Sequence, residues 1–171
     1  MAFAHAVPPA EPHRGVDRSS FRGPGVIAPP PLIYLVGLAL GFGLEALLPS
    51  PALPGVVRWV LGTALLALAV ALGGAFVSSF QRARTPIDVR KPARTLVTEG
   101  PFRLSRNPGY VAMVLAYAGT ALITGTLWTF ATLVPTLVVV DRGVIRREER
   151  HLEKRFGEEY RRYKARTRRW L

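Results

Sequence analysis

The sequence predicts an all-helical membrane protein with about four membrane-spanning helices in two hairpins, followed by an amphipathic helix at the membrane surface. Two observations support this fold class. The 171 residues are 49% hydrophobic and yet carry a net charge of +12, so apolar and charged residues must be segregated along the chain. Segregation is indeed strong, because residues 59–81 and 109–140 contain no Asp, Glu, Lys, Arg or His. The chain therefore has apolar runs of membrane length, since one crossing needs about 20 apolar helical residues.

Four apolar segments follow from this pattern. The first, residues 31–48, begins at the end of a triple proline and is interrupted only by Glu45. The second covers residues 56–79. The uncharged run that follows is too long for one crossing, and a Thr-Gly-Thr turn divides it into segments 109–124 and 126–141. We therefore expect a first hairpin at residues 29–81.

The basic residues predict the orientation of these helices. If both hairpins start and end on one side, 22 of the 23 Lys and Arg residues lie on that side. The positive-inside tendency places this side, with both termini, in the cytoplasm. Contact with anionic lipid explains the excess of basic over acidic residues, so no nucleic-acid partner is needed to explain it. Zero cysteines and three scattered histidines predict no metal site.

Three domains are expected along the chain. Residues 1–28 are Pro-rich and have no signal-peptide core, which indicates a mobile cytoplasmic arm. Residues 29–81 form the first hairpin, and residues 82–171 form the functional core. In the first hairpin, Gly37 and Gly41 indicate close helix packing. Glu45 and Arg58 are expected to form an interfacial ion pair rather than a functional intramembrane site.

The connection from Arg82 to Asn107 is 26 residues long, which is typical of a functional or disordered loop. Asn107 is predicted as the N-cap of the third membrane helix and Pro108 as its first residue. The free N–H groups of that helix and Arg106 together favour an anion such as a carboxylate or phosphate. An equally weighted alternative is that Arg106 and Tyr110 only anchor the helix at the lipid headgroups.

A helix is predicted from residue 142 to 166, because apolar side chains recur there at helical spacing. These apolar side chains lie along one face of the helix, and the same face, followed towards the N-terminus of the helix, carries Glu148 and Glu149. Pairing of these carboxylates within the helix, with Arg142 and Arg146 respectively, is the structural alternative to a functional role. The hairpins place the helix beside the connection, so we expect one pocket to combine the side chains of Phe102, Arg106, Asn107, Tyr110 and Glu148.

Two motifs in these segments carry a resemblance to a known family. "TLVTEGPFRLSRNPGYVAM" and "REERHLEKRFGEEYRRYKARTRRW" are similar to the signatures "LVTSGPY...RHPxY" and "EExxL...FGxxYxxY" of membrane methyltransferases. That family includes isoprenylcysteine carboxyl methyltransferases and phospholipid N-methyltransferases. The resemblance covers about residues 82–169.

The resemblance implies an S-adenosyl-L-methionine-dependent enzyme. In this interpretation Phe102 and Tyr110 lie on either side of the aromatic base of the cofactor. Glu148 accepts a hydrogen bond from the ribose or the ammonium group of the cofactor, and Arg94 or Arg106 binds its carboxylate. Arg106 and Glu148 are the catalytic candidates. The implied cofactor-binding positions are Arg94, Thr95, Leu96, Val97, Phe102, Asn107, Pro108, Gly109, Tyr110, Glu148 and Glu149.

The methyl acceptor is less well specified. Carboxyl methyltransferases of this family hold their substrate with an arginine where this chain has Val144. Either Arg142 or Arg146 binds the substrate instead, or the substrate has no carboxylate. We expect a lipophilic acceptor that enters from the membrane, either a prenylcysteine-like carboxylate or a lipid headgroup, with membrane lipids as partners. Two alternatives remain: a non-enzymatic protein whose basic tail binds anionic lipid, and a nicotinamide-dependent membrane reductase.

Overall fold

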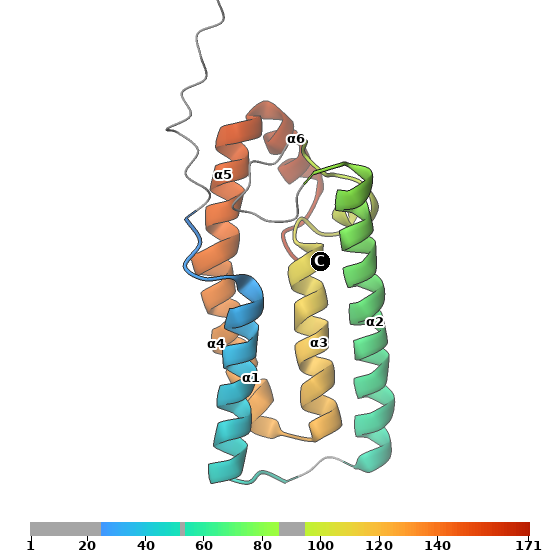
Figure 1. Ribbon diagram of the computed structural model, residues 1–171, viewed down its shortest axis with the longest axis vertical. Coiled ribbons are helices and arrows are strands. Elements are labelled where there is room, and N and C mark those ends of the chain that lie inside the picture. The colour runs from blue at the N-terminus through green and yellow to red at the C-terminus, as the bar shows by residue number, and fades with distance from the viewer. Residues whose placement is uncertain (1–24, 52–53, 86–94) are drawn as a thin grey trace, which may run out of the picture.

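The computed structural model describes residues 25–51, 54–85 and 95–171, and within these ranges it is helical without strands (Figure 1). The all-helical prediction is therefore confirmed. Only the last four residues of the predicted arm at 1–28 belong to the described ranges. The elements in chain order are α1 (Pro30–Leu47), α2 (Gly55–Arg82), the 3-10 turn η2 (Gly100–Arg103), α3 (Pro108–Thr124), α4 (Leu127–Val140), the π-helical turn η3 (Asp141–Ile145), α5 (Arg146–Phe156) and α6 (Glu158–Arg166).

Helices α1 to α4 correspond to the four predicted segments. Helix α1, helix α2 and the continuous helical stretch Leu127–Phe156 are long and apolar enough to cross a membrane, and α3 is apolar but shorter, with 17 residues. Many large apolar side chains of α1 and α2 are exposed on the outside of the bundle. An exposed apolar surface of this extent is expected of helices that face lipid.

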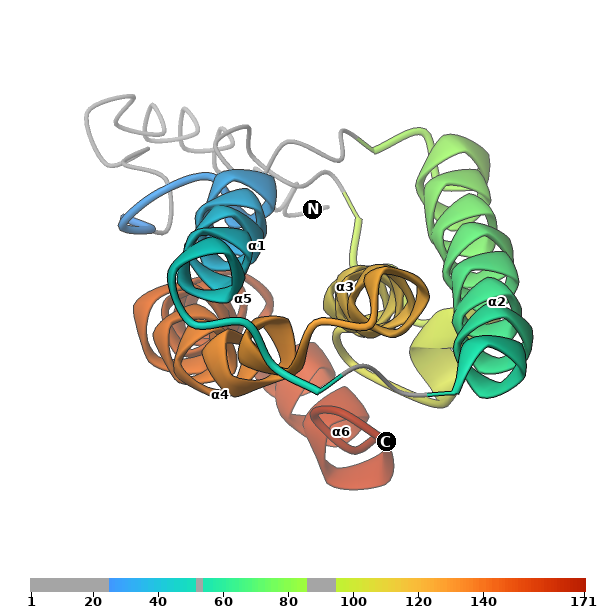
Figure 2. The same ribbon diagram turned by 90° about the horizontal axis from the view of Figure 1, so that it is seen from below.

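The helices pack most extensively across the two hairpins. Helix α2 lies along α3, and α1 lies along α4, whereas α3 and α4 share fewer contacts. Figure 2 shows α3 between α2 on one side and the pair formed by α1 and α4 on the other. Helix α3 is therefore the central helix of the bundle, and its first residue lies at the end where the basic segments gather.

Glycines allow both close helix pairs. A Cβ at Gly41 of α1 would lie 2.6 Å from the Cα of Thr129 in α4, and a Cβ at Gly37 would collide with Thr136. The prediction of close packing at Gly37 and Gly41 is thus confirmed. Helices α2 and α3 approach each other in the same way, because a Cβ at Gly119 would lie 2.9 Å from the carbonyl oxygen of Gly62.

The predicted ion pair between Glu45 and Arg58 is wrong. The carboxylate of Glu45 accepts hydrogen bonds from the backbone N–H and the hydroxyl of Ser50, at 2.8 Å and 2.7 Å. Arg58 instead lies against Gly125, in the turn between α3 and α4. The short loop after α1 brings Ser50 back onto Glu45, so a local partner replaces the distant arginine.

We expect Gly41→Ala to destabilise the bundle, because the new methyl group would overlap the backbone of α4. Overpacking of this kind costs about 1–3 kcal/mol. The matched control is Gly43→Ala on the same helix, where an added Cβ meets no atom within 4 Å. Thermal unfolding in detergent, followed by circular dichroism, should show a lower midpoint for Gly41→Ala only. Equal midpoints for the two variants would contradict the close crossing.

Candidate functional site

The candidate site lies at the end of the bundle formed by residues 95–107 and 141–171, which we call the basic end. Helix α4 continues into α5 through the π-helical turn η3 without a break. Gly157, with a φ of 52°, then separates α5 from α6. The predicted single helix from residue 142 to 166 is wrong in this respect, because a positive φ ends a helix and glycine adopts it at little cost.

Glu148 on α5 binds the first turn of α3. The hydroxyl of Tyr110 donates a hydrogen bond to Oε1 of Glu148 at 2.8 Å. Tyr110 is itself buried, in an apolar cluster with Tyr34, Tyr117 and Val144. A carboxylate that accepts a hydrogen bond from a buried phenol is held in one orientation. The structure thus joins the two sequence motifs through Glu148 and Tyr110.

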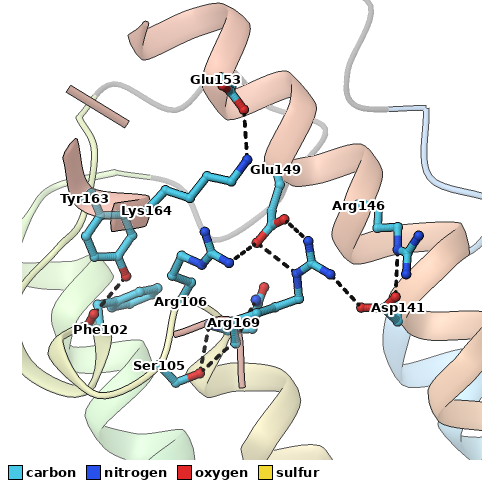
Figure 3. A network of polar contacts seen from close by, with 11 residues as sticks. Phe102, Ser105, Arg106, Asp141, Arg146, Glu149, Glu153, Tyr163, Lys164 and Arg169 are labelled. Atoms are coloured by element: carbon cyan, nitrogen blue, oxygen red, sulfur yellow. Dashed lines mark hydrogen bonds and ion pairs between the residues drawn. The ribbon is translucent and has the colours of Figure 1, made fainter. Parts of the chain in front are cut away.

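Glu149 lies between two arginines (Figure 3). Its residue is only 5% exposed. Arg169 approaches both carboxylate oxygens, with Nη2 at 2.7 Å and Nε at 3.3 Å, and Nη2 of Arg106 lies 3.3 Å from Oε1. The hydrogen bond with Glu149 raises the pKa of the Arg169 guanidinium, which therefore stays charged. Asp141 pairs with Arg169 and with Arg146, so three guanidinium groups face two carboxylates and one positive charge is in excess.

Neither of the pairings considered within the helix is formed. Arg146 binds Asp141 in η3, with Nε 2.8 Å from Oδ2, so it does not pair with Glu149. Arg142 is exposed, and Glu148 binds Tyr110 rather than this arginine. Tertiary contacts with α3 and with the chain end therefore replace the contacts expected from helical spacing.

The C-terminal segment, residues 167–171, lies across the start of α3. The carbonyl oxygen of Arg168 accepts from the N–H of Arg106 at 2.9 Å. The carbonyl oxygen of Arg169 accepts from Nδ2 of Asn107 at 2.9 Å and from Oγ of Ser105 at 3.2 Å. These contacts fix the backbone of residues 105–107, so the C-terminal segment supports the candidate site through its backbone carbonyl groups.

Pro108 begins α3 as predicted, but Asn107 does not cap the helix with its side chain. Asn107 occupies the N-cap position without a side-chain cap hydrogen bond. Its backbone oxygen accepts from the N–H groups of Tyr110 and Val111, while its side chain binds the C-terminal segment. The preference of asparagine for the N-cap thus predicted the position correctly and the hydrogen bond wrongly.

Arg106 has hydrogen-bonding capacity to spare. Its side chain is 10% exposed. Only Nη2 meets a carboxylate, and Nε and Nη1 are buried without a hydrogen-bond partner. Buried polar groups nearly always have a partner, and a guanidinium has donors but no acceptor. The two free nitrogens therefore favour an anionic ligand at this position.

Phe102 lies in a different apolar cluster from Tyr110. Its ring packs on Phe76 and Phe80 of α2, with ring centroids 5.8 Å and 5.7 Å away. The hydroxyl of Tyr163 in α6 donates to the carbonyl oxygen of Phe102 at 2.8 Å. Burial raises the pKa of Tyr163, so its phenol remains a donor. The structure thus gathers Arg106, Asn107, Tyr110 and Glu148, while Phe102 fixes the loop onto α2 and α6.

The other predicted positions are spread around this group. Leu96 and Val97 are half-buried against the cluster of Phe102, Thr95 is exposed, and Arg94 lies outside the described residues. The two predicted substrate arginines, Arg142 and Arg146, are exposed. Val144, at the position of the family's arginine, is completely buried. Gly109 lies against the ring of Phe76.

Sequence reasoning missed three residues of this region. Asp141 directly follows an apolar segment, and this position was a signal that could have identified it. Arg169 gave no such signal, because it is one of twelve basic residues after Val140. Tyr34 of α1 is 5% exposed, and its buried hydroxyl has no partner. Across the described ranges, no three His, Asp or Glu side chains gather as they would around a metal ion.

A family model described as phospholipid methyltransferase matches residues 57–159, which is more than half of the chain and contains both Tyr110 and Glu148. The protein belongs to the phospholipid methyltransferase family. The predicted resemblance is confirmed, and the apolar helices together with the family indicate an integral membrane methyltransferase. The reductase and the non-enzymatic lipid-binding protein lose support accordingly.

Among curated proteins, an uncharacterized protein of Haemophilus influenzae is 37% identical over 62 residues, which make up 36% of this chain and 98% of that protein. No solved structure matches the chain.

We expect Glu149→Ala to destabilise the membrane methyltransferase, because it leaves the buried guanidinium of Arg106 without its carboxylate. Breaking a buried ion pair costs about 3–5 kcal/mol, and the lower end applies here because Arg169 reaches water. The matched control is Glu159→Ala, on the exposed face of α6. Thermal unfolding in detergent should separate the variants, and an unchanged midpoint for Glu149→Ala would contradict the buried pair.

Proposed function

We propose that this membrane methyltransferase transfers a methyl group from S-adenosyl-L-methionine to a lipophilic acceptor at the cytoplasmic membrane surface. The observation that carries the proposal is the pairing of Glu148 with Tyr110 next to a buried, partly unpartnered Arg106. These residues come from the two motifs that resemble the family's signatures. The proposal includes a cytoplasmic location for both termini, which the concentration of positive charge at the basic end supports.

The side chains at the site fit the functional groups of the cofactor. S-adenosyl-L-methionine carries a carboxylate, an ammonium group and a ribose diol. Arg106 has unengaged donors at Nε and at Nη1, on two different edges of the guanidinium, and either donor suits the carboxylate. Glu148 suits the ammonium or the diol, because Tyr110 binds Oε1 and the carboxylate has further acceptor positions. Glu149 was also a predicted cofactor position, but arginines engage both of its oxygens, so a supporting role suits it better.

The residues of the site would act mainly by positioning. When bound, the cofactor supplies an electrophilic methyl group on a positively charged sulfur. Arg106 and Glu148 would hold its two charged ends, and Tyr110 would keep Glu148 in one orientation. Correct placement of two reactants and exclusion of water supply a large part of the acceleration in such a transfer. No dedicated acid or base is needed for a carboxylate acceptor, whereas an amine acceptor must lose its proton to solvent before the nitrogen attacks the methyl group.

A phospholipid amine is the acceptor that the site supports best. A prenylcysteine-like acceptor would need a cation for its carboxylate, and the family's position for that arginine holds the buried Val144. Arg146 is engaged by Asp141, and Arg142 is exposed. The description of the matching family also names phospholipids. The exposed apolar faces of α1 and α2 suit a protein surrounded by lipid, which supports a lipid acceptor.

Glu148→Gln should weaken cofactor binding while the protein still inserts and folds. The amide keeps the shape and an acceptor for Tyr110 but loses the charge. A hydrogen bond to a charged group contributes about 1.5–3 kcal/mol, or roughly tenfold to a hundredfold in Kd. Isothermal titration of S-adenosylhomocysteine in nanodiscs measures the change, with Glu159→Gln as the exposed control. Wild-type affinity in Glu148→Gln would remove Glu148 from the site.

Methyl transfer itself can be followed with radiolabelled S-adenosyl-L-methionine in vesicles. We expect label in an amine-headgroup phospholipid and little label in a prenylcysteine offered at the same concentration. Preferred labelling of the prenylcysteine would overturn the choice of acceptor but not the proposed activity. Absence of both cofactor binding and transfer, in a correctly folded preparation with either acceptor, would overturn the proposed function.

A further inference from the structure

Arg169 lies beyond the matched family range and touches the candidate site only through other protein groups. Its backbone oxygen is held by Ser105 and Asn107, and its guanidinium binds Glu149 and reaches Asp141 at 3.5 Å. The neighbouring Trp170 packs on the apolar cluster that contains Tyr110. Arg169 is therefore held at both its backbone and its side chain, although it is the third residue from the end of the sequence.

The contacts of Glu149 are divided unequally between its two arginines. Arg169 supplies two nitrogens, at 2.7 Å and 3.3 Å, and Arg106 supplies one, at 3.3 Å. Asp141 also pairs with Arg169 and with Arg146, so the network contains three guanidinium groups and two carboxylates, which leaves one net positive charge. Within this network the unengaged donors belong to Arg106, whose Nε and Nη1 are buried without a partner.

We propose that Arg169 is a positioning residue of the candidate site, which binds Glu149 so that Arg106 is free to receive the carboxylate of the methyl donor. This inference rests on the proposed function. Without Arg169, Glu149 and Arg106 neutralise each other, and the buried Glu149 takes up more of the donors of Arg106. The site then has no surplus positive charge for the cofactor carboxylate, although Glu148 and Tyr110 are unchanged.

The test compares two ligands that differ only in this carboxylate: S-adenosyl-L-methionine and its decarboxylated analogue. Both are titrated calorimetrically against the full chain in nanodiscs. For Arg169→Ala we expect the Kd of S-adenosyl-L-methionine to rise roughly tenfold or more, as for loss of a charged hydrogen bond. The Kd of the analogue should change little. A general loss of structure would weaken both ligands equally, and that result would overturn the proposal.

Arg168→Ala is the matched control. The Arg168 side chain is exposed, and its contact with residue 106 uses only the backbone oxygen, which alanine retains. This variant removes the same charge from the neighbouring position, so a general effect of the basic surface appears in both variants. We expect wild-type affinity for both ligands in Arg168→Ala. Equal losses in Arg168→Ala and Arg169→Ala would overturn the role of Arg169.

A double variant separates positioning from stability. Glu149→Gln removes the carboxylate that Arg169 neutralises. The addition of Arg169→Ala to this variant should therefore change the Kd of S-adenosyl-L-methionine by less than about threefold, because the two residues act through one another. This comparison is between two variants that both lack the Glu149 carboxylate, so it does not depend on the folding of Arg169→Ala alone. A large additional loss would overturn the inference.

The outcomes also distinguish this inference from the proposed function. If the wild-type protein binds S-adenosyl-L-methionine and Arg169→Ala binds it equally well, only the role of Arg169 fails. If the folded wild-type protein binds neither ligand, the proposed function fails, and the inference fails with it.

Discussion

The ion pairs of Glu149 with Arg106 and Arg169 are the contacts on which the arrangement of the basic end depends. They join the loop before α3, the helix α5 and the C-terminal segment, which are far apart in the sequence. Buried ion pairs often add little net stability, because desolvation offsets their attraction. Their value here is geometric. Successive residues of an α-helix point about 100° apart, so fixing Glu149 also directs Glu148 towards Tyr110.

The bundle supplies the rigid frame for this arrangement. Gly41 allows α1 to approach α4 closely, Gly119 allows α3 to approach α2, and α3 lies between α2 and the pair of α1 and α4. Its first residue, Pro108, then lies at the basic end with Arg106 just before it. The π-helical turn Asp141–Ile145 adds a residue to the turn of the helix that leaves the bundle. This addition rotates α5 relative to a regular continuation of α4, and Glu148 and Glu149 consequently face α3 and the chain end.

Local features of the sequence were predictable, and long-range pairings were not. Uncharged runs determine the helices, because lipid tolerates few charges, and Gly37 and Gly41 determine a close crossing. The partners of Glu149 could not be derived from spacing, because Arg146 is much closer in sequence than either partner but binds Asp141. The same is true of Phe102, whose ring position depends on Phe76 and Phe80 in another helix. Arg169 carries no local signal, since its role comes entirely from the folded position of the chain end.

The charges of the basic end also bear on the proposed reaction. S-adenosyl-L-methionine has a net positive charge, and its demethylated product has none. A uniformly basic surface attracts anionic lipid but repels this cofactor, so the site needs carboxylates of its own. Glu148 supplies one that no arginine engages among the described residues, while Glu149 and Asp141 are bound to arginines. In the proposed reaction, loss of the sulfonium charge would remove part of the attraction to Glu148. The same electrostatic contact that favours binding of the proposed donor would therefore favour release of the product.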